Sequence, residues 1–271
     1  MSFPADWIVP DWPAPAGVRA VFTSRCGGNS APPFDSFNLG DHVGDDPAAV
    51  AIHRWRLREI LGARPVFLQQ VHGAAVAKLD RSTPDGVVAD ACVTRASGVA
   101  CTIIVADCLP VLLTDRRGRV LAAAHAGWRG LAGVADQGVL EAVFKKFCEE
   151  SSVNRSFIAT ESIASETLAW LGPCIGPQAF EVGAPVREAF CDTDSGAARL
   201  FQPRGDGKFL ADLAGLARRR LRALGITHLY GNDGSPAWCT VSQSSVFFSH
   251  RRDAARLGGS GRLAACIWRA G

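Results

Sequence analysis

The sequence contains no long apolar run and little net charge. No stretch of its 271 residues approaches the roughly 20 consecutive apolar residues that a membrane helix needs, so we expect no membrane partner. The formal net charge of +3 is too small to indicate a nucleic-acid-binding surface. Hydrophobic residues make up 48% of the chain and charged residues 20%, which is typical of a globular protein with a sizeable core.

The sequence also lacks the pattern of a disulfide framework. Its nine cysteines are scattered, no Cys-x-x-Cys pair occurs, and no basic segment followed by an apolar one marks the N-terminus for secretion. Most of these cysteines lie among apolar residues, where a free thiol behaves as a small hydrophobic side chain. We therefore expect free thiols and a cytoplasmic location. Methionine occurs only once, at position 1.

Hydrophobic spacing and turn residues predict the secondary structure. Residues 18–24 and the C-terminal RLAACIWRA are expected to be strands, since apolar residues alternate or run together there. Asp46 and Pro47 mark the start of a helix that Gly62 ends. Helical spacing also predicts helices over residues 131–148 and 208–225.

The order of these elements indicates the fold class. Several strands occur in succession before each helix, which favours an α/β (α+β) fold of layered, mixed sheets flanked by helices over a regular βαβ array. No repeat, low-complexity segment or linker is visible. We expect one domain over residues 1–271, with residues 1–17 peripheral to it.

Two histidines and one cysteine stand at the ends of predicted strands. Cys108 follows the apolar run IIVAD, His125 ends the run LAAAH, and His72 precedes a glycine in QQVHG. Side chains at such positions can face a cleft, so the three form a candidate site. His53, in contrast, falls inside the first predicted helix among several arginines, and we expect it to be solvated.

These three side chains permit more than one chemistry. Two imidazoles and a thiolate suit zinc in an open catalytic site, where the metal lowers the pKa of a bound water to about 7. Blue-copper sites use the same ligands but add an axial methionine. Copper is disfavoured because the sole methionine is Met1 and no His-x-His pair exists for a multicopper cluster. Without a metal, Cys108 and His125 could form a thiolate–imidazole dyad for acyl transfer.

Two arginines near flexible backbone are candidates for binding an anion. Arg25 lies in RCGGN and Arg251 in SHRRD, and guanidinium groups pair well with phosphate. The turn GPCIGP, which holds Cys174, reads as the rigid wall of a pocket. Trp128 and Phe248 are rings that could stack on a planar base or equally belong to the core.

Several of these motifs together resemble one protein family. QQVHG, ADCLPVLL, AAHAGWRG, GPCIGP and FFSHRRD, with SRCGGNS and FNLGDHVGDDP upstream, are similar to the bacterial laccase-domain proteins, formerly labelled multicopper polyphenol oxidases. The resemblance runs in order from about residue 18 to the C-terminus. It implies a single α/β domain similar to that of toxin-type cysteine hydrolases, and zinc bound by His72, Cys108 and His125. In the last motif His250 stands where the family usually has tyrosine.

The resemblance also implies an activity. Members are described as purine nucleoside phosphorylases with adenosine deaminase side-activity, acting on adenosine, inosine, guanosine or methylthioadenosine, and some as peptidoglycan-editing amidases. A general acid/base cannot be named, because no His-x-Glu motif occurs here. Alternatives are a Cys108–His125 amidase acting on a cell-wall precursor, a laccase-like polyphenol oxidase, and a non-enzymatic metal- or partner-binding protein. We expect a monomer or a weak homo-oligomer.

The expected site residues follow from these arguments. The zinc ligands and Asp107 form the catalytic set, in which Asp107 or the metal would polarise or protonate the departing base. Arg25 and Arg251 are expected to orient phosphate. The other expected substrate contacts are Asn38, Arg129, Cys174 and Phe248.

Overall fold

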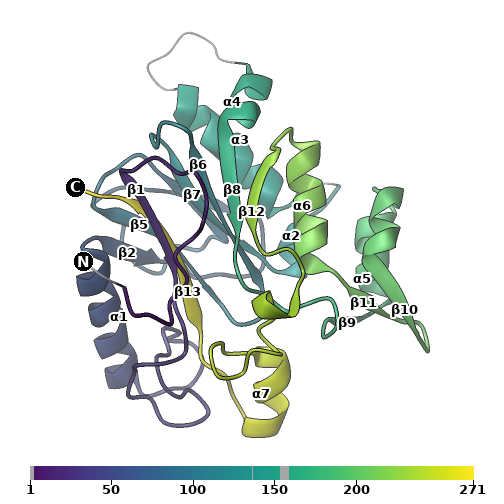
Figure 1. The fold of residues 1–271 in the computed structure, drawn as a ribbon, viewed down its shortest axis with the longest axis horizontal. Helices are drawn as coiled ribbons and strands as arrows, with labels where there is room; N and C mark the ends of the chain where they lie inside the picture. The colour runs from purple at the N-terminus through teal and green to yellow at the C-terminus, as the bar shows by residue number, and fades with distance from the viewer. Residues whose placement is uncertain (1–2, 136, 153–158) are drawn as a thin grey trace.

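Two mixed β-sheets lie face to face at the centre of the protein, and a small antiparallel sheet stands beside them (Figure 1). The computed structural model describes residues 3–135, 137–152 and 159–271. In spatial order the first sheet consists of β1 (Val18–Phe22), β13 (Leu263–Arg269), β5 (Val99–Val105) and β2 (Arg64–Phe67). The second consists of β12 (His228–Gly231), β8 (Thr167–Leu171), β6 (Leu109–Asp115), β7 (Leu121–Ala126), β4 (Ala91–Thr94) and β3 (Val76–Leu79).

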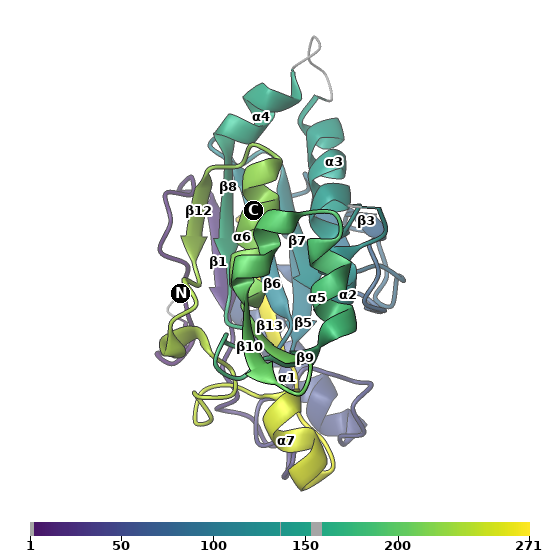
Figure 2. The ribbon, with the colours of Figure 1, turned by 90° about the vertical axis from the view of Figure 1, so that its right-hand side faces the viewer.

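The third sheet and the helices complete the fold. The third sheet pairs β10 (Phe201–Gly205), β11 (Lys208–Ala211) and β9 (Glu181–Gly183). The α-helices are α1 (Pro47–Leu61), α2 (Trp128–Ala132), α3 (Val139–Ser152), α4 (Thr160–Glu166), α5 (Ala184–Cys191), α6 (Leu213–Ala223) and α7 (His250–Leu257). Two short 3₁₀ turns are η1 (Ser195–Leu200) and η2 (Pro236–Trp238). In the view turned by 90°, α4 and α7 lie at opposite ends of the molecule (Figure 2).

Three apolar clusters join these elements into layers. One cluster fills the space between the two large sheets, one joins the first sheet to α1, and one joins the second sheet to α2, α3 and α6. Strand β5 is buried on both faces, which explains its mostly apolar sequence: Ile103 faces the other sheet while the next residue, Ile104, faces α1. The prediction of an α/β fold of layered, mixed sheets flanked by helices is confirmed.

Helix α1 begins and ends where the sequence predicts. The Asp46 carboxylate accepts a hydrogen bond from the backbone N–H of Ala48 at 3.0 Å, which satisfies one of the donors that a helix start leaves unpaired. Pro47 occupies the first turn, where its missing N–H is not needed. Gly62 ends the helix with φ of 60°, a left-handed conformation that glycine adopts without steric cost.

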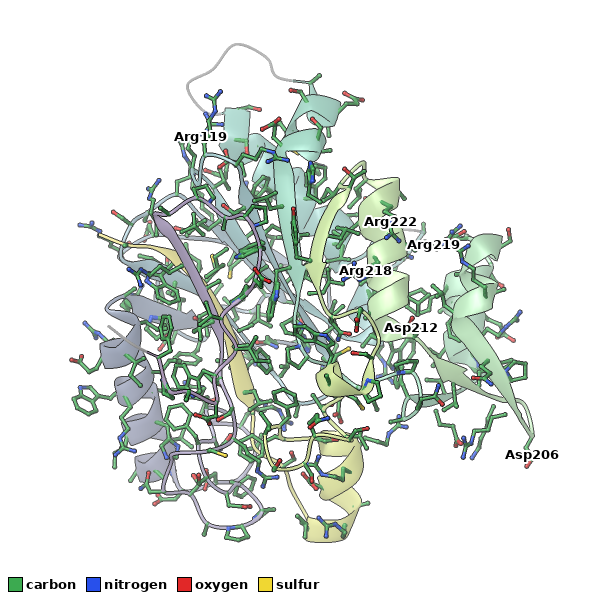
Figure 3. The ribbon with its side chains drawn as sticks, in the orientation of Figure 1. Arg119, Asp206, Asp212, Arg218, Arg219 and Arg222 are labelled. Carbon is green, nitrogen blue, oxygen red and sulfur yellow. The ribbon has the colours of Figure 1, made fainter. Side chains whose placement is uncertain are left out.

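Two other helix predictions were wrong in extent. The expected helix over residues 131–148 is two helices, because Gly133 turns the chain with φ of 68° after α2 and α3 begins only at Val139. The expected helix over residues 208–225 begins at Leu213, since residues 208–211 form β11 and the Asp212 carboxylate caps the helix start. Arg218, Arg219 and Arg222 project from α6 in Figure 3. The spacing of apolar residues alone does not show where a strand ends and the following helix begins.

The N-terminal segment is docked on the first sheet. Ile8 pairs with Phe22 at the end of β1, and the Trp7 side chain is buried against Phe37 and the cluster under α1. The nine cysteines are free thiols, as the sequence predicts. Within the described ranges, no helix combines the length and the apolar character needed to cross a membrane.

Candidate active site

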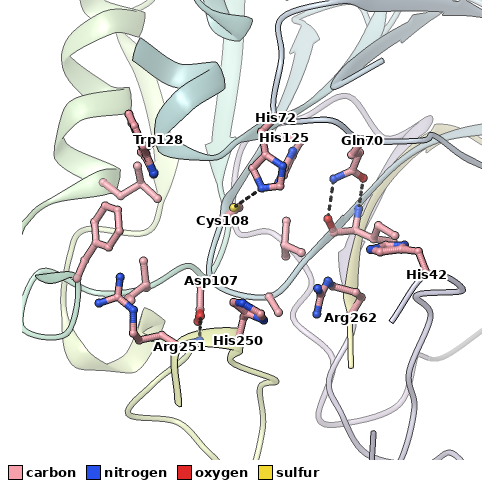
Figure 4. Close-up of a pocket in the computed structure, with 16 residues that line it drawn as sticks. His42, Gln70, His72, Asp107, Cys108, His125, Trp128, His250, Arg251 and Arg262 are labelled. Atoms are coloured by element: carbon pink, nitrogen blue, oxygen red, sulfur yellow. Dashed lines mark hydrogen bonds between the residues drawn. The ribbon is translucent and has the colours of Figure 1, made fainter. Parts of the chain in front are cut away.

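The structure brings together the three side chains that the sequence singles out. His72 lies in the loop after β2, Cys108 lies in the short link between β5 and β6, and His125 lies near the end of β7. Their ligand atoms all lie within 4.8 Å of one another, and His72 Nε2 is 3.8 Å from Cys108 Sγ (Figure 4). Exposure falls across the group, from exposed His72 to buried His125. The group therefore opens to solvent on one side, as a catalytic metal site does.

Backbone conformation places two of these loops. His72 has φ of 61° and Asp107 has φ of 83°, both in the left-handed region that side chains other than glycine rarely adopt. Asp107 occupies the point where the chain leaves the first large sheet for the second, and the sharp turn presents Cys108 to the histidines. Such conformations persist only where surrounding contacts hold them.

Asp90 supplies the contacts that hold the His72 loop. This carboxylate is fully buried just before β4, and its Oδ1 accepts hydrogen bonds from His125 Nδ1 at 2.9 Å and from the His72 N–H at 2.8 Å. Its Oδ2 accepts from the N–H groups of Val71 at 3.2 Å and Gly73 at 2.7 Å. With Nδ1 donating to Asp90, His125 keeps Nε2 for the site. No sequence signal singled out Asp90, since it is one of many Asp residues at a strand start.

The charges of the group are set by one another. Burial raises the pKa of the Cys108 thiol, but the positive charge of His125 and hydrogen bonds from both histidines outweigh burial and lower that pKa to about 6. Burial lowers the pKa of His125, but the Cys108 thiolate and Asp90 outweigh it and raise that pKa to about 9. Without a metal, the pair is a thiolate and an imidazolium near neutral pH. A thiolate is the form that binds metal or attacks a carbonyl.

Glycine in the motif AAHAGWRG leaves space for the group. A Cβ atom on Gly127 would lie 2.9 Å from His72 Cδ2 and 3.0 Å from Cys108 Sγ. A Cβ atom on Gly130 would lie 2.6 Å from the carbonyl oxygen of Gly73, which would push the His72 loop away. Both glycines are thus required by the close approach of α2 to the ligand loops.

A pocket of about 270 Å³ opens over the three side chains. This volume is near the lower end of ligand pockets, which run from roughly 300 Å³ upward. The lining residues are Ile104, Val105, Ala106, Ile175, Phe180, Leu213 and Trp128 on the apolar side, and His42, Gln70, His72, Asp107, Cys108, His125, His250, Arg251 and Arg262 on the polar side. Figure 4 places His42, Arg262, His250 and Arg251 along the edge away from His72 and His125.

Asp107 and Arg251 are in the pocket but are engaged with the protein. Asp107 Oδ1 accepts from the Thr240 hydroxyl at 2.5 Å, and its Oδ2 accepts from the backbone N–H of Arg251 at 2.6 Å, at the start of α7. The Arg251 guanidinium donates to the carbonyl oxygen of Glu181 at 3.1 Å. Asp107 thereby fixes the first turn of α7, which carries His250 and Arg251.

Arg25 and Phe248 lie outside this pocket. Arg25 donates to the carbonyl oxygens of Asp35 and Ser244 and pairs with the Asp35 carboxylate at 3.1 Å, beside a separate hollow. Its guanidinium lies over the fully buried ring of Phe248, 4.8 Å from the ring centre. The structure thus gives both residues protein partners instead of a place beside His72.

Two further expected substrate contacts also lie outside the pocket lining. Cys174 is buried beneath it and accepts a hydrogen bond from the Asn232 amide at 3.3 Å. Arg129 is exposed and its guanidinium lies 4.4 Å from the ring centre of Trp128, which does line the pocket.

Asn38 and His53 form a buried pair that the sequence does not reveal. Asn38 is fully buried, and its Oδ1 accepts from the N–H groups of Gly40 and Arg262. The expectation that His53 is solvated was wrong: the ring is fully buried, Nδ1 lies 2.8 Å from the carbonyl oxygen of Asn38, and Nε2 accepts from the N–H of Asn29 at 3.0 Å. The arginines next to His53 in sequence lie on other faces of α1, so their charge does not report the exposure of His53.

Sequence reasoning missed most of the apolar lining of the pocket and three of its polar residues, Gln70, His42 and Arg262. Gln70 donates to the carbonyl oxygen of Ile104 at 2.8 Å and accepts from its N–H at 2.9 Å, which ties the His72 loop to β5. Gln70 stands in QQVHG and His42 in FNLGDHVGDD, so the motifs themselves were the available signal. Arg262, between a glycine and the last strand, has no signal of its own.

Comparison with known proteins agrees with the resemblance seen in the motifs. The model of a family described as multi-copper polyphenol oxidoreductase laccase matches residues 19–270. The chain belongs to this family. Purine nucleoside phosphorylase PA4543 of Pseudomonas aeruginosa is 47% identical over 264 residues, which cover 97% of this chain and 98% of that protein. Purine nucleoside phosphorylase YfiH of Escherichia coli is 45% identical over 263 residues, covering 96% and 98%.

A solved structure extends the likeness within the family to three dimensions. The crystal structure of Neisseria meningitidis protein NMB0706 superimposes with a TM-score of 0.86 at 42% sequence identity, covering 98% of this chain and 100% of that one. The likeness in three dimensions therefore extends over nearly the whole chain.

Proposed function

We propose that this protein is a purine nucleoside phosphorylase that uses a zinc site formed by His72, Cys108 and His125. The observation that carries the proposal is the pocket: it holds a metal-binding group on one side, arginines on another, and aromatic walls at Phe180 and Trp128. Its size suits a small polar ring compound. Family relatives that are 47% and 45% identical over nearly the whole chain carry the name purine nucleoside phosphorylase, which supports the same reaction here.

The donor set fits zinc. A thiolate and two imidazoles are ligands that zinc prefers, and the open side leaves a position for water or substrate. Asp90 holds His125 through Nδ1, as carboxylates do for zinc-bound histidines. A multicopper cluster needs further histidines around the metal-binding group, but among the described residues only His72, Cys108 and His125 lie close enough together to hold a metal ion. When bound, zinc would supply Lewis acidity at this end of the pocket.

The reaction joins phosphate to the sugar. An oxygen of phosphate forms a bond to C1′ of the ribose while the C1′–N bond to the purine breaks, and the purine leaves with a proton to give base and ribose 1-phosphate. Arg251 lines the pocket and would orient the phosphate, whereas Arg25 lies beside a separate hollow. Asp107 would act through α7, because both of its oxygens accept protein hydrogen bonds. Adenosine, inosine, guanosine and methylthioadenosine are the proposed substrates.

We extend the proposal to deamination of adenosine as a side-activity. Water would add its oxygen to C6 of the purine and ammonia would leave, giving inosine. This reaction needs a group that moves a proton beside the metal-binding side chains. His250 lines the same pocket, but at the edge away from His72 and His125 (Figure 4), so we name no residue for this proton transfer.

One comparison tests the phosphorylase proposal. Purified protein is incubated with inosine in the presence and absence of inorganic phosphate, and hypoxanthine and ribose 1-phosphate are both measured. We expect both products only when phosphate is present, and loss of both with Cys108→Ala. Base release at the same rate without phosphate would refute phosphorolysis, and stoichiometric copper in metal analysis would refute the zinc assignment.

A second candidate function rests on one further observation. Asp90, His125 and Cys108 form a chain in which a carboxylate orients a histidine beside a thiolate, the arrangement of a cysteine hydrolase. The thiolate would attack an amide carbonyl, such as one in the peptide stem of a cell-wall precursor, and His125 would protonate the departing amine. Amide cleavage that persists in metal-free protein and is lost with Cys108→Ser would favour this function over the phosphorylase.

The remaining proposals concern the cellular location, the binding partners and the oligomeric state of the protein. The nine free thiols suit a reducing compartment, so we propose a cytoplasmic location. The proposed partners are a nucleoside and phosphate, and the single-domain organisation over residues 1–271 and the monomeric or weakly associating state stay predictions. Size-exclusion chromatography with light scattering would measure the oligomeric state.

A further inference from the structure

Arg262 is a half-buried pocket residue whose guanidinium has no carboxylate partner in the described part of the chain. Its Nη1 donates to the carbonyl oxygens of Ser260 at 2.8 Å and Gly261 at 3.1 Å. Two other half-buried arginines pair with acids, Arg220 with Glu141 and Arg252 with Asp253. Arg64, Arg218 and Arg269 donate to backbone carbonyl oxygens as Arg262 does, but they lie outside the pocket. The negative charges that act on this guanidinium are those of Cys108 and Asp107, and neither forms an ion pair with it. In the described structure only Nη1 donates hydrogen bonds within the protein, so Nε and Nη2 are left to donate to an anionic ligand.

The protein holds Arg262 rigidly. Its backbone N–H donates to Asn38 Oδ1 at 2.8 Å, and its carbonyl oxygen accepts from the N–H of Leu39 at 3.1 Å. Its side-chain stem packs so closely on Gly40 that a Cβ atom there would lie 2.6 Å from Arg262 Cγ. His53 fixes Asn38 in turn through the Asn38 carbonyl oxygen. The buried residues Asn38 and His53 thus place an arginine that does line the pocket.

Other hydrogen-bonding side chains lie beside Arg262. His42, His250 and Arg251 line the same edge of the pocket (Figure 4). The nearby acids are bonded to the protein: Asp107 accepts two hydrogen bonds, and Asp41 pairs with Arg54 and with His42. The pocket therefore offers guanidinium and imidazole donors at this edge and metal-binding side chains at the other.

We propose that Arg262 is the principal phosphate-binding residue of the pocket, with Arg251, His42 and His250 completing the subsite. The assignment rests on the proposed phosphorylase function, because it takes the anion to be the inorganic phosphate that attacks the sugar. Phosphate at this edge leaves the opposite end, beside Trp128, for the purine. A phosphoryl group carried by the substrate itself, as in a nucleoside 5′-phosphate, has the same anion chemistry and is distinguished by the test below.

The test compares two variants that lose the same charge. Arg262→Gln removes the proposed contact, and Arg256→Gln is the matched control, because Arg256 lies exposed on α7 outside the pocket. With saturating inosine, we expect Arg262→Gln to raise the KM for phosphate by about tenfold or more, while the KM for inosine changes by less than about threefold. Arg262→Lys is expected to fall between, since lysine keeps the charge but loses the planar fork. A KM for phosphate within twofold of wild type in Arg262→Gln would overturn the proposal.

Direct binding separates failure of this subsite from failure of the proposed function. Inorganic phosphate and AMP are titrated into each protein and followed by tryptophan fluorescence, with urea unfolding as a check that each variant is folded. If the wild type makes no ribose 1-phosphate, the phosphorylase function fails, yet phosphate binding that is lost in Arg262→Gln and kept in Arg256→Gln still supports the anion subsite. Binding of AMP but not of phosphate through Arg262 would overturn the assignment to the free anion.

Discussion

Asp90→Asn tests the claim that one carboxylate assembles the metal-binding group. All four hydrogen-bond partners of the Asp90 carboxylate are donors: His125 Nδ1 and the His72 N–H at Oδ1, and the N–H groups of Val71 and Gly73 at Oδ2. An ionised carboxylate only accepts, so it satisfies all four. Asparagine has the same shape, but whichever way its amide is oriented, its NH₂ group faces two donors and two hydrogen bonds are lost.

The structure sets the size of this effect. Each lost bond to a charged, buried acceptor costs about 1.5–3 kcal/mol, so Asp90→Asn is expected to lower the free energy of unfolding by roughly 3–6 kcal/mol. Urea unfolding followed by tryptophan fluorescence measures it, on metal-free protein so that metal binding does not contribute. Asp206→Asn is the control, since Asp206 is exposed at the β10–β11 turn with φ of 50°, which asparagine tolerates equally. A loss below about 1 kcal/mol in Asp90→Asn would refute the reasoning.

Three further predictions follow from the same geometry. Gly127→Ala would press on His72 and Cys108, so we expect about 10- to 100-fold weaker zinc binding in a chelator competition, whereas Gly17→Ala, with open space around it, binds zinc like wild type. Cys108→Ser is expected to lose stoichiometric zinc, because the soft thiolate is gone; full zinc content by elemental analysis would contradict this. Burial lowers the pKa of His53, so protonation favours the unfolded chain and stability is expected to fall as pH drops below 6.5. Between pH 6.5 and 5, the change of the unfolding free energy with pH should be smaller in His53→Gln than in the wild type. An unchanged pH dependence would contradict the role given to His53.

The metal-binding residues could be predicted from the sequence, but the residues that hold them in place and complete the pocket could not. His72, Cys108 and His125 could be named because each stands at a strand end inside a distinctive motif, and metal chemistry restricts which residue types matter. Asp90 could not be named, since its role depends on four donors that come from two separated segments. Arg262 was missed for the same reason: its lack of a carboxylate partner is a property of the folded neighbourhood and not of GRLAAC.

The errors in the sequence interpretation have one physical origin. His53 looked solvated beside its arginine neighbours, and Arg25 looked free beside glycines, yet each is bonded by a segment distant in sequence: His53 by Asn29 and Asn38, Arg25 by Ser244. The layered architecture was predictable because the spacing of apolar residues indicates which faces of strands and helices are buried. The hydrogen-bond and ion-pair partners of polar side chains were not predictable, because the sequence offers many residues that could serve and only the fold decides between them.

The passage of the chain from β5 to β6 through Asp107 and Cys108 has a consequence for how the metal and the fold depend on each other. The ligands come from the junction of two sheets, so the complete set exists only while those sheets are docked. A metal that binds this set and not the unfolded chain adds stability by mass action, about 2.7 kcal/mol at a free concentration of 100 Kd. Metal content would then act as a reporter of sheet docking, and zinc release during denaturation should coincide with loss of the whole sandwich instead of preceding it.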